Sequence, residues 1–483
     1  MLDLRPVGYV IGLLVAALGA AMAAPLAVDL LAANGNWSAF AVSGAAAVAA
    51  GVMLAASCRG SRREGLSVQQ TFMLTTSVWV ALPVFGALPF TLGAPEASYT
   101  DAFFEAMSGL TTTGSTVFSN LDAMPAGTLL WRALLQWFGG VGVIIVALAF
   151  LPSLRVGGMQ LFRSESFDTF GKILPRAAEI AARISAVYIA LTALCAVVYA
   201  TLGMTLFDAV SHAMTTVATG GFANYDASFA AFPPAVEYAA ATFLVLASLP
   251  FVRYVQLLAG TARPLWRDPQ VRAFLSIAAV VVVALALWRA GLPGAGGWEQ
   301  AFRKALFNGV SILTGAGYAS EDYGRWGTFP VAVFFVIGLI GGCAGSTCCA
   351  IKVFRFQVLG AAIWAQARSI HSPSGVFIPR FGGRPVDESS LSSVMSFFYL
   401  FALTLGVVTV ALSMMGLAPI TAISGAATAL ANVGPGLGPE IGPAGNFAGL
   451  PDEAKWLLSA AMLVGRLEIL SVFVLFTWWF WRA

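Results

Sequence analysis

Ten apolar runs, each about as long as a membrane is thick, constrain the fold of this chain more than any other feature. A helix needs about 20 mostly apolar residues to cross the hydrocarbon layer of a bilayer. The runs lie near residues 7–31, 38–57, 70–92, 129–151, 184–205, 236–259, 273–290, 330–356, 391–416 and 454–481. Only 10% of the 483 residues are charged, against about 25% in soluble domains. The sequence therefore predicts an all-α polytopic membrane protein with no separate soluble domain.

The charged residues are divided unequally between the two sides that these crossings define. With the N-terminus inside, 19 of the 26 basic residues lie on the inner side and 14 of the 23 acidic residues on the outer side. Because basic loops remain in the cytoplasm, we expect a multi-pass protein of the cytoplasmic (inner) membrane with both termini inside. The outer face then has a net charge of −8, which concentrates cations. The inner face has a net charge of +11, although the topology rule alone explains that sign equally well.

Cysteine and histidine give no indication of a disulfide framework or a metal site. None of the five cysteines falls in an outer loop, and the chain has only two histidines. Cys343, Cys348 and Cys349 have no histidine nearby, so we interpret them as small apolar residues. A metal-dependent hydrolase is therefore disfavoured, and no organic cofactor is expected.

Four short segments align without gaps, and each lies between two long crossings. They are DAFFEAMSGLTTTG (101–114), DAVSHAMTTVATGG (208–221), KALFNGVSILTGAG (304–317) and TAISGAATALANVG (421–434), and all four end in glycine. Each holds a half-span of about ten residues, which is too short to cross but long enough for a re-entrant helix. The chain is therefore predicted to contain two N-terminal helices followed by four helix–pore-loop–helix repeats.

The ends of these segments have the character of an ion selectivity filter. Polar extended backbone at membrane depth is tolerated where it lines an aqueous cavity, and backbone carbonyls can replace the water around a cation. Glycine lacks Cβ and permits positive φ, which lets carbonyls turn inward. The predicted filter residues are Thr112, Thr113, Gly114, Thr219, Gly220, Gly221, Gly315, Ala316, Gly317, Asn432, Val433 and Gly434. Ordinary outer loops with glycine turns are the alternative, and the shared register argues against them.

The sequence resembles the TrkH family, the membrane subunits of Trk potassium uptake systems, within a wider superfamily of K+ transporters. The matching motifs are SGLTTTG (108–114), LPSLRVGGMQLFRSE (151–165), TTVATGGF (215–222), GGCAGSTCCAIKV (341–353), ANVGPG (431–436) and MLVGRLEIL (462–470). The resemblance implies a pseudotetrameric pore, K+ as the transported ion bound by backbone carbonyls of the filter residues, and a homodimer in membrane lipid. It also implies gating by a TrkA-like cytosolic nucleotide-binding subunit. No nucleic acid is expected as a partner.

The repeats and the resemblance together divide the chain into five parts. These are a two-helix N-terminal extension (1–66), pore repeat 1 (67–160), pore repeat 2 (161–265), pore repeat 3 with a gating loop (266–372) and pore repeat 4 (373–483). Repeat 3 departs from the family pattern, because cysteines stand in its glycine-rich run where the family usually has smaller residues.

A gate is predicted beneath the filter. In GLIGGCAGSTCCA (338–350), each glycine weakens a helix by about 1 kcal/mol relative to alanine. We therefore expect a loop across the pore, with glycine-mediated helix packing as the alternative. Arg466 lies within the last crossing, where a cation usually faces water or a partner, and the resemblance implies that it lies near this loop. Glu468 would point to another helix face. The predicted gate residues are Gly341, Gly342, Cys343, Gly345 and Arg466.

The leading interpretation is K+ uptake through a gated, K+-selective pore. A Na+-permeable relative of the same superfamily is an alternative. In the plant branch of that superfamily, serine at the first filter-glycine position accompanies Na+ permeation, whereas all four positions here are glycine. An intramembrane enzyme would need paired acids, a Ser/Lys pair or a His/Glu metal set within the crossings, where only Arg466 and Glu468 stand together. A non-conducting receptor would leave four filter-like loops without a purpose.

Overall fold

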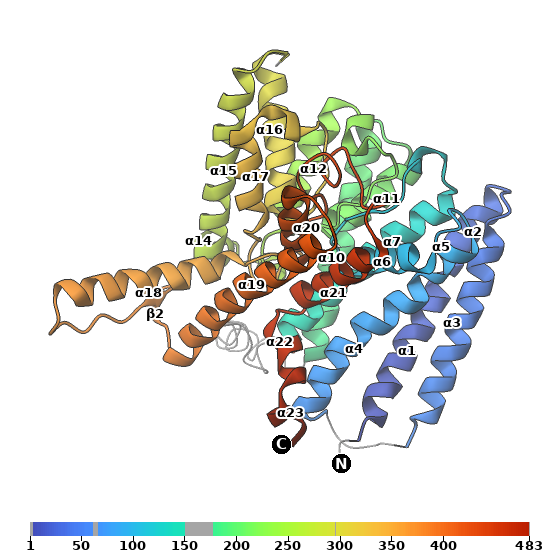
Figure 1. Cartoon of the computed structure of the whole chain (residues 1–483), viewed down its shortest axis with the longest axis horizontal. Coiled ribbons are helices and arrows are strands. Elements are labelled where there is room, and N and C mark those ends of the chain that lie inside the picture. Colours follow the sequence, from blue (N-terminus) through green and yellow to red (C-terminus); the bar gives the residue numbers. More distant parts are fainter. Residues whose placement is uncertain (1–2, 61–65, 150–176, 295, 483) are drawn as a thin grey trace.

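The structure is a bundle of helices with one short β-hairpin (Figure 1). The computed structural model describes residues 3–60, 66–149, 177–294 and 296–482. The motif at 151–165, most of the basic inner segment at 152–183 and the boundary between repeats 1 and 2 lie largely or wholly outside the described residues.

The N-terminal extension forms a tight helical hairpin. Its helices are α1 (Arg5–Ala21), α2 (Ala23–Leu31) and α3 (Trp37–Ser57). The backbones of α1 and α3 lie so close that a Cβ added to Gly51 would come within 2.5 Å of the Gly12 carbonyl oxygen. Small residues permit such close helix packing in a membrane. Asp29 of α2 is fully buried and accepts a hydrogen bond of 2.7 Å from the Gly127 N–H, which ties the hairpin to repeat 1.

Each repeat has the predicted order of a long helix, a short pore helix and a second long helix. Repeat 1 contains α4 (Val68–Gly86), α5 (Leu88–Leu92), α6 (Tyr99–Leu110), η1 (Leu121–Ala123) and α7 (Ala126–Ala149). Repeat 2 contains α10 (Ala177–Thr201), α11 (Leu206–Val217), η2 (Ser228–Ala231), α12 (Pro234–Ala247), α13 (Phe251–Leu258) and α14 (Arg263–Arg267). Repeat 3 contains α15 (Pro269–Ala290), α16 (Trp298–Leu313), η3 (Tyr323–Trp326), α17 (Thr328–Gly338) and α18 (Val353–His371).

Repeat 4 follows the β-hairpin and has the same order. The hairpin strands are β1 (Arg380–Phe381) and β2 (Arg384–Pro385), with Arg380 opposite Pro385. The helices of repeat 4 are α19 (Glu388–Met414), α20 (Pro419–Ala431), α21 (Asp452–Arg466), α22 (Leu470–Phe473), η4 (Val474–Phe476) and α23 (Trp478–Arg482). The pore helices are therefore α6, α11, α16 and α20 (Figure 1).

Local sequence explains where the first two pore helices begin. Ser98 caps α6 by accepting a hydrogen bond from the Asp101 N–H, and Thr205 caps α11 by accepting one from the Asp208 N–H. In each case the hydroxyl also donates to the carboxylate three residues later, at 3.0 Å and 2.7 Å. Such caps satisfy free N–H groups and place acids at the positive end of the helix dipole.

Three of the predicted crossings are broken rather than continuous. The crossing at 236–259 bends by 91° between α12 and α13, because Pro250 ends α12. The crossing at 330–356 is interrupted by a loop at 339–352, as the glycine-rich run predicts. The crossing at 454–481 bends by 105° after Arg466. The expectation that Arg466 and Glu468 share one helix is therefore wrong, since Glu468 has a φ of 64° at the break.

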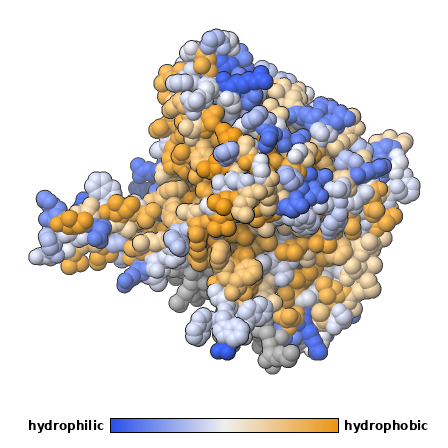
Figure 2. Space-filling model, viewed as in Figure 1, coloured by the Kyte–Doolittle hydropathy of each residue, from blue (hydrophilic) through white to orange (hydrophobic). Residues whose placement is uncertain are grey.

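The described helices account for a multi-pass membrane protein. Six of them are long and apolar enough to span a bilayer, or eight spans if each bent pair counts as one. The remaining two predicted crossings are α7, which is described as Ala126–Ala149, and the interrupted segment at 330–356. Figure 2 shows apolar residues along the flank of the bundle and polar residues towards its upper end. Both chain ends lie at the lower end (Figure 1).

Candidate functional site

The four pore helices end in the same backbone motif. In each, the residue just past the helix adopts the left-handed conformation, with φ of 52° at Thr112, 51° at Thr219, 80° at Gly315 and 53° at Asn432. The next N–H bonds back to the carbonyl five residues earlier, in the pairs Thr113–Ser108, Gly220–Thr215, Ala316–Ser311 and Val433–Thr428, at 2.8–3.1 Å. This is the Schellman ending of a helix. Three of these left-handed residues are not glycine, and strain of this kind clusters at functional sites.

The glycines predicted at the loop ends also have positive φ. The values are 87° at Gly114, 84° at Gly221, 81° at Gly317 and 95° at Gly434. Each loop therefore has positive φ at its first and third residues and not at its second. We call the twelve residues 112–114, 219–221, 315–317 and 432–434 the four-loop ring.

The ring is closed by one contact that recurs between successive loops. A Cβ added to the glycine of one loop would strike the carbonyl oxygen of the second residue of the next loop. The distances are 2.2 Å from Gly114 to Gly220 O, 1.7 Å from Gly221 to Ala316 O, 2.1 Å from Gly317 to Val433 O and 3.0 Å from Gly434 to Thr113 O. The contacts pass once around the four repeats and return to the first. Glycine is required here by close approach as well as by φ.

A cavity opens on the side of this ring that faces away from the 339–352 loop. It has a volume of about 290 Å³, and its lining includes all four ring glycines. The adjacent outer loops are held by buried polar contacts. Arg132 of α7 donates to Glu105 of α6 at 2.8 Å and to the Ala223 carbonyl at 2.8 Å. Of the charged residues predicted to lie on the outer side, four acids and four bases are buried, so the predicted excess of eight acids belongs to less buried residues.

The 339–352 loop lies on the other side of the ring from this cavity and touches three other repeats. In repeat 2 it reaches the break between α12 and α13, where the Cys343 N–H donates to Ser248 O at 3.0 Å. In repeat 4 the Ala350 N–H donates at 2.9 Å to Ala431 O, the last residue of α20. In repeat 1 the Cys349 thiol lies 3.6 Å from the Thr112 hydroxyl. The loop therefore passes directly beneath the ring.

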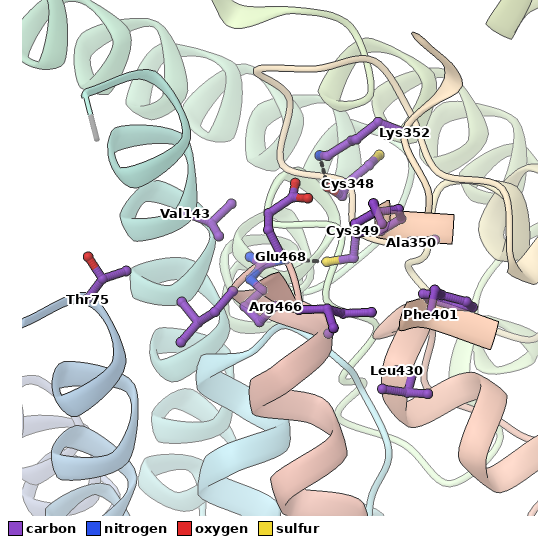
Figure 3. A pocket seen from close by; sticks show the side chains of 14 residues that line it. Thr75, Val143, Cys348, Cys349, Ala350, Lys352, Phe401, Leu430, Arg466 and Glu468 are labelled. Carbon is purple, nitrogen blue, oxygen red and sulfur yellow. Dashed lines mark hydrogen bonds between the residues drawn. The ribbon is translucent and has the colours of Figure 1, made fainter. Parts of the chain in front are cut away.

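Arg466 lies in the same layer as this loop (Figure 3). Its guanidinium hydrogen-bonds the Cys349 sulfur and donates to the Gly139 carbonyl at 3.3 Å. The side chain is 6% exposed. A small cavity of about 40 Å³ beside it is lined by residues of α21 and of the 339–352 loop. Arg466 thus joins the final repeat to the loop of the third.

Further charged side chains are buried near Arg466. Lys352 donates to the Cys348 carbonyl (Figure 3), and Arg355 forms an ion pair with Glu468. The Arg355 guanidinium also lies 3.8 Å from the centre of the Phe397 ring. Glu468 therefore contacts the first turn of α18 rather than Arg466.

The structure brings together all twelve predicted filter residues but divides the predicted gate residues. Gly341, Gly342 and Gly345 belong to the loop, whereas the Cys343 side chain packs into the hydrophobic core of repeat 3. The thiol beside Arg466 is that of Cys349, which sequence reasoning treated as a small apolar residue. Sequence reasoning also missed Arg132, Gln136, Lys352, Arg355 and Glu468 as buried polar contacts. The available signal was a polar residue in a long apolar run.

Four re-entrant helices that end in one closed ring, inside a bundle of spanning helices, define a pore-loop membrane protein. A family model described as cation transport protein, TrkH, matches residues 37–479. The Trk system potassium uptake protein TrkI of Halomonas elongata is 46% identical over 417 residues, covering 86% of this chain and 84% of the relative. The protein named TrkH in Escherichia coli K12 is 37% identical over 485 residues, covering 99% of both chains.

The fold agrees with a solved structure over the whole chain. The crystal structure of the potassium transporter TrkH from Vibrio parahaemolyticus superimposes with a TM-score of 0.92, is 34% identical and covers 100% of both chains. This chain belongs to the TrkH family of cation transport proteins. The resemblance seen in the motifs is therefore confirmed, as is the predicted fold of two N-terminal helices and four pore-loop repeats. The family is one of transporters and not of enzymes.

Proposed function

We propose that this chain takes up potassium across the cytoplasmic membrane through a gated, K+-selective pore. The observation that carries the proposal is the four-loop ring, which lies between an outer cavity and the buried charges beneath it. The names of the relatives, which are potassium uptake proteins, support potassium as the ion. The transported K+ is the substrate, and the proposal involves no organic cofactor.

The backbone of the ring suits a dehydrated cation. A chain that alternates positive and other φ values turns successive carbonyls towards one side, and carbonyl oxygens can replace the hydration shell of K+. The pore helices also direct the partially negative ends of their dipoles at the ring. The ligands proposed for K+ are the backbone carbonyls of the twelve predicted filter residues. Glycine at all four loop ends favours K+ over Na+ as the preferred ion.

The direct test is 86Rb+ flux into proteoliposomes with competing K+ and Na+, comparing the parent protein with Gly114→Ser. The substitution places an atom 2.2 Å from Gly220 O, so we expect weaker discrimination against Na+ in a folded protein. Gly260→Ser is the matched control, because Gly260 has a φ of 90° and no atom within 4 Å of an added Cβ. An unchanged K+ over Na+ preference in Gly114→Ser would remove Gly114 from the filter.

We also propose that the 339–352 loop and Arg466 form the gate. A guanidinium cannot release its proton to relieve repulsion of a passing cation. Arg466 is buried just inside the ring, and its bond to Cys349 couples it to the loop. Movement of the loop would therefore move the charge barrier. The gate as proposed contains Gly341, Gly342, Gly345 and Arg466 from the sequence prediction, together with Cys349.

A cytosolic nucleotide-binding partner is proposed to act on this gate. The inner segments carry most of the basic residues, which suits an acidic partner surface, and the relatives are named as members of a Trk system. Co-purification with a nucleotide-binding subunit would support this partner. Full nucleotide-regulated flux from this chain alone would contradict it.

We further propose a homodimer with both termini in the cytoplasm. α18 extends away from the bundle (Figure 1) and exposes Ile363, Trp364 and Ile370 at 61%, 72% and 73%, and exposed apolar patches mark contact surfaces. The mass of the detergent-solubilised protein tests the dimer, and a monomer would contradict it.

The division into 1–66, 67–160, 161–265, 266–372 and 373–483 is proposed on the order of the helices.

A further inference from the structure

One side chain from outside the four loops reaches the ring. Gln136 of α7 is fully buried. Its Nε2 donates to the Gly220 carbonyl at 2.6 Å, and its Oε1 accepts from the Phe222 N–H at 3.0 Å. The two partners fix the orientation of the amide, because one is an acceptor and the other a donor. The amide therefore spans the peptide units on both sides of the ring residue Gly221.

Each loop has one carbonyl oxygen, that of its second residue, that meets the glycine of the preceding loop. The contact with Gln136 distinguishes one of these four oxygens from the other three. Gly220 O is the oxygen that meets Gly114 in the ring, and it accepts a short hydrogen bond from Gln136. In the described part of the chain, the equivalent oxygens of Thr113, Ala316 and Val433 accept no hydrogen bond. The ring is thus symmetric in backbone shape and asymmetric in the chemistry of its oxygens.

Glycine at position 220 is matched to Gln136. The other loops have Thr113, Ala316 and Val433 at this position. A Cβ on Gly220 would lie 2.4 Å from the Gln136 Cδ and Oε1. The missing side chain at Gly220 therefore makes the space that the glutamine amide fills.

We propose that Gln136 is a positioning residue that helps to set the K+ over Na+ selectivity of the pore. The inference rests on the proposed filter function of the ring. The positive end of the Nε2 N–H dipole partly offsets the negative potential that Gly220 O presents to an ion, and a weaker ligand field favours the larger K+. The bridge also stiffens the loop against collapse around the smaller Na+. Both effects favour K+ over Na+. The expected loss of selectivity without Gln136 is therefore the same whether selectivity comes from the field strength of the carbonyls or from the size of the site.

The same face of α7 fastens the loop at a second point. Arg132, one turn before Gln136, donates to Ala223 O at 2.8 Å. The loop from Gly220 to Ala223 is therefore held by α7 along its whole length. Because Arg132 keeps that loop in place when Gln136 is replaced, the substitution changes the ring locally.

The test is Gln136→Met, which keeps the length of the side chain and removes both hydrogen bonds. We expect the K+ over Na+ preference, measured by 86Rb+ flux in proteoliposomes, to fall roughly fivefold, the effect of one hydrogen bond. The K+ concentration for half-maximal flux should rise, with unchanged expression and elution in size-exclusion chromatography. Gln69→Met is the matched control, since Gln69 donates to Phe480 O at 2.7 Å and lies outside the four-loop ring.

Two further variants separate this inference from the filter proposal. Gly220→Ala displaces the side-chain amide of Gln136. In a Gln136→Met background, Gly220→Ala should therefore have little further effect on selectivity. Additive effects, or an unchanged preference in a well-folded Gln136→Met protein while Gly114→Ser relaxes selectivity, would overturn the role of Gln136 and leave the filter intact. If neither Gly114→Ser nor Gln136→Met changes the preference, the filter proposal itself fails. If Gln136→Met does not fold, Gly220→Ala becomes the test, and an unchanged K+ over Na+ preference in Gly220→Ala would overturn the role of Gln136.

Discussion

The four-loop ring and the layer beneath it are constructed in opposite ways. In the ring, every repeat contributes the same helix ending and the same contact to its neighbour. Beneath the ring, each repeat contributes a different element: the 339–352 loop comes from repeat 3, Arg466 from repeat 4 and the break at Pro250 from repeat 2. Equivalent ligands around an axis suit a bound ion, whereas a loop that comes from one repeat can move while the ring keeps its shape.

The largest expected effect comes from breaking the ring at its tightest contact. A Cβ in Gly221→Ala would lie 1.7 Å from Ala316 O, so the backbone must shift. Strain of about 3 kcal/mol corresponds to a loss of roughly 100-fold in 86Rb+ flux. Gly260→Ala, at a similar φ with open space around it, should keep normal flux. Normal flux in Gly221→Ala would show that the ring does not form the conducting path.

The next effect concerns the element that occurs only once. Deleting residues 341–343 shortens the loop beneath the ring, and basal flux should rise by about tenfold while its dependence on the cytosolic partner weakens. A deletion of residues 373–375, in the exposed segment after α18, is the control. Reduced flux at normal expression would count against a gating role for the loop.

Removing the charge alone should have a smaller effect than removing the loop. Arg466→Ala takes away the fixed cation but leaves the loop to occlude the path, so we expect basal K+ flux to rise about threefold. Arg272→Ala, an exposed basic residue, should behave as the parent. Lost expression would assign Arg466 a structural role, and normal expression with no increase in flux would exclude the barrier.

The smallest effect is expected at the loosest contact of the ring. In Gly434→Ala the new Cβ would lie 3.0 Å from Thr113 O, a distance that a few tenths of an ångström of movement relieves. Flux should fall by less than about threefold, and selectivity should change less than in Gly221→Ala. An equal or larger loss in Gly434→Ala would show that φ rather than the contact distance limits the ring.

The sequence predicts the ring better than the gate for a physical reason. A position that needs both positive φ and a missing Cβ leaves glycine in the sequence, so Gly114, Gly221, Gly317 and Gly434 reveal the repeats. The left-handed residues Thr112 and Thr219 leave no such trace, because threonine seldom adopts that conformation.

The break after Arg466 was less accessible to sequence reasoning than the other two breaks. Apolar composition continues through 454–481, so nothing local shows that the helix bends after Arg466. The partners of buried polar side chains are equally hidden, since Gln136 and Gly220 are 84 residues apart. Lys352 and Arg355 stand at the end of the predicted crossing at 330–356, where basic residues normally mark the inner surface of the membrane, whereas the structure buries them.

The ion pair between Arg355 and Glu468 has a consequence for biosynthesis. The two residues are 113 positions apart, so Arg355 leaves the ribosome long before its acid exists. Arg355 lies in the first turn of α18, and a buried guanidinium is stabilised by pairing with an acid. The final packing of α18 against the bundle therefore waits for repeat 4, and a chain truncated before Glu468 lacks the acid that pairs with Arg355 in the folded protein.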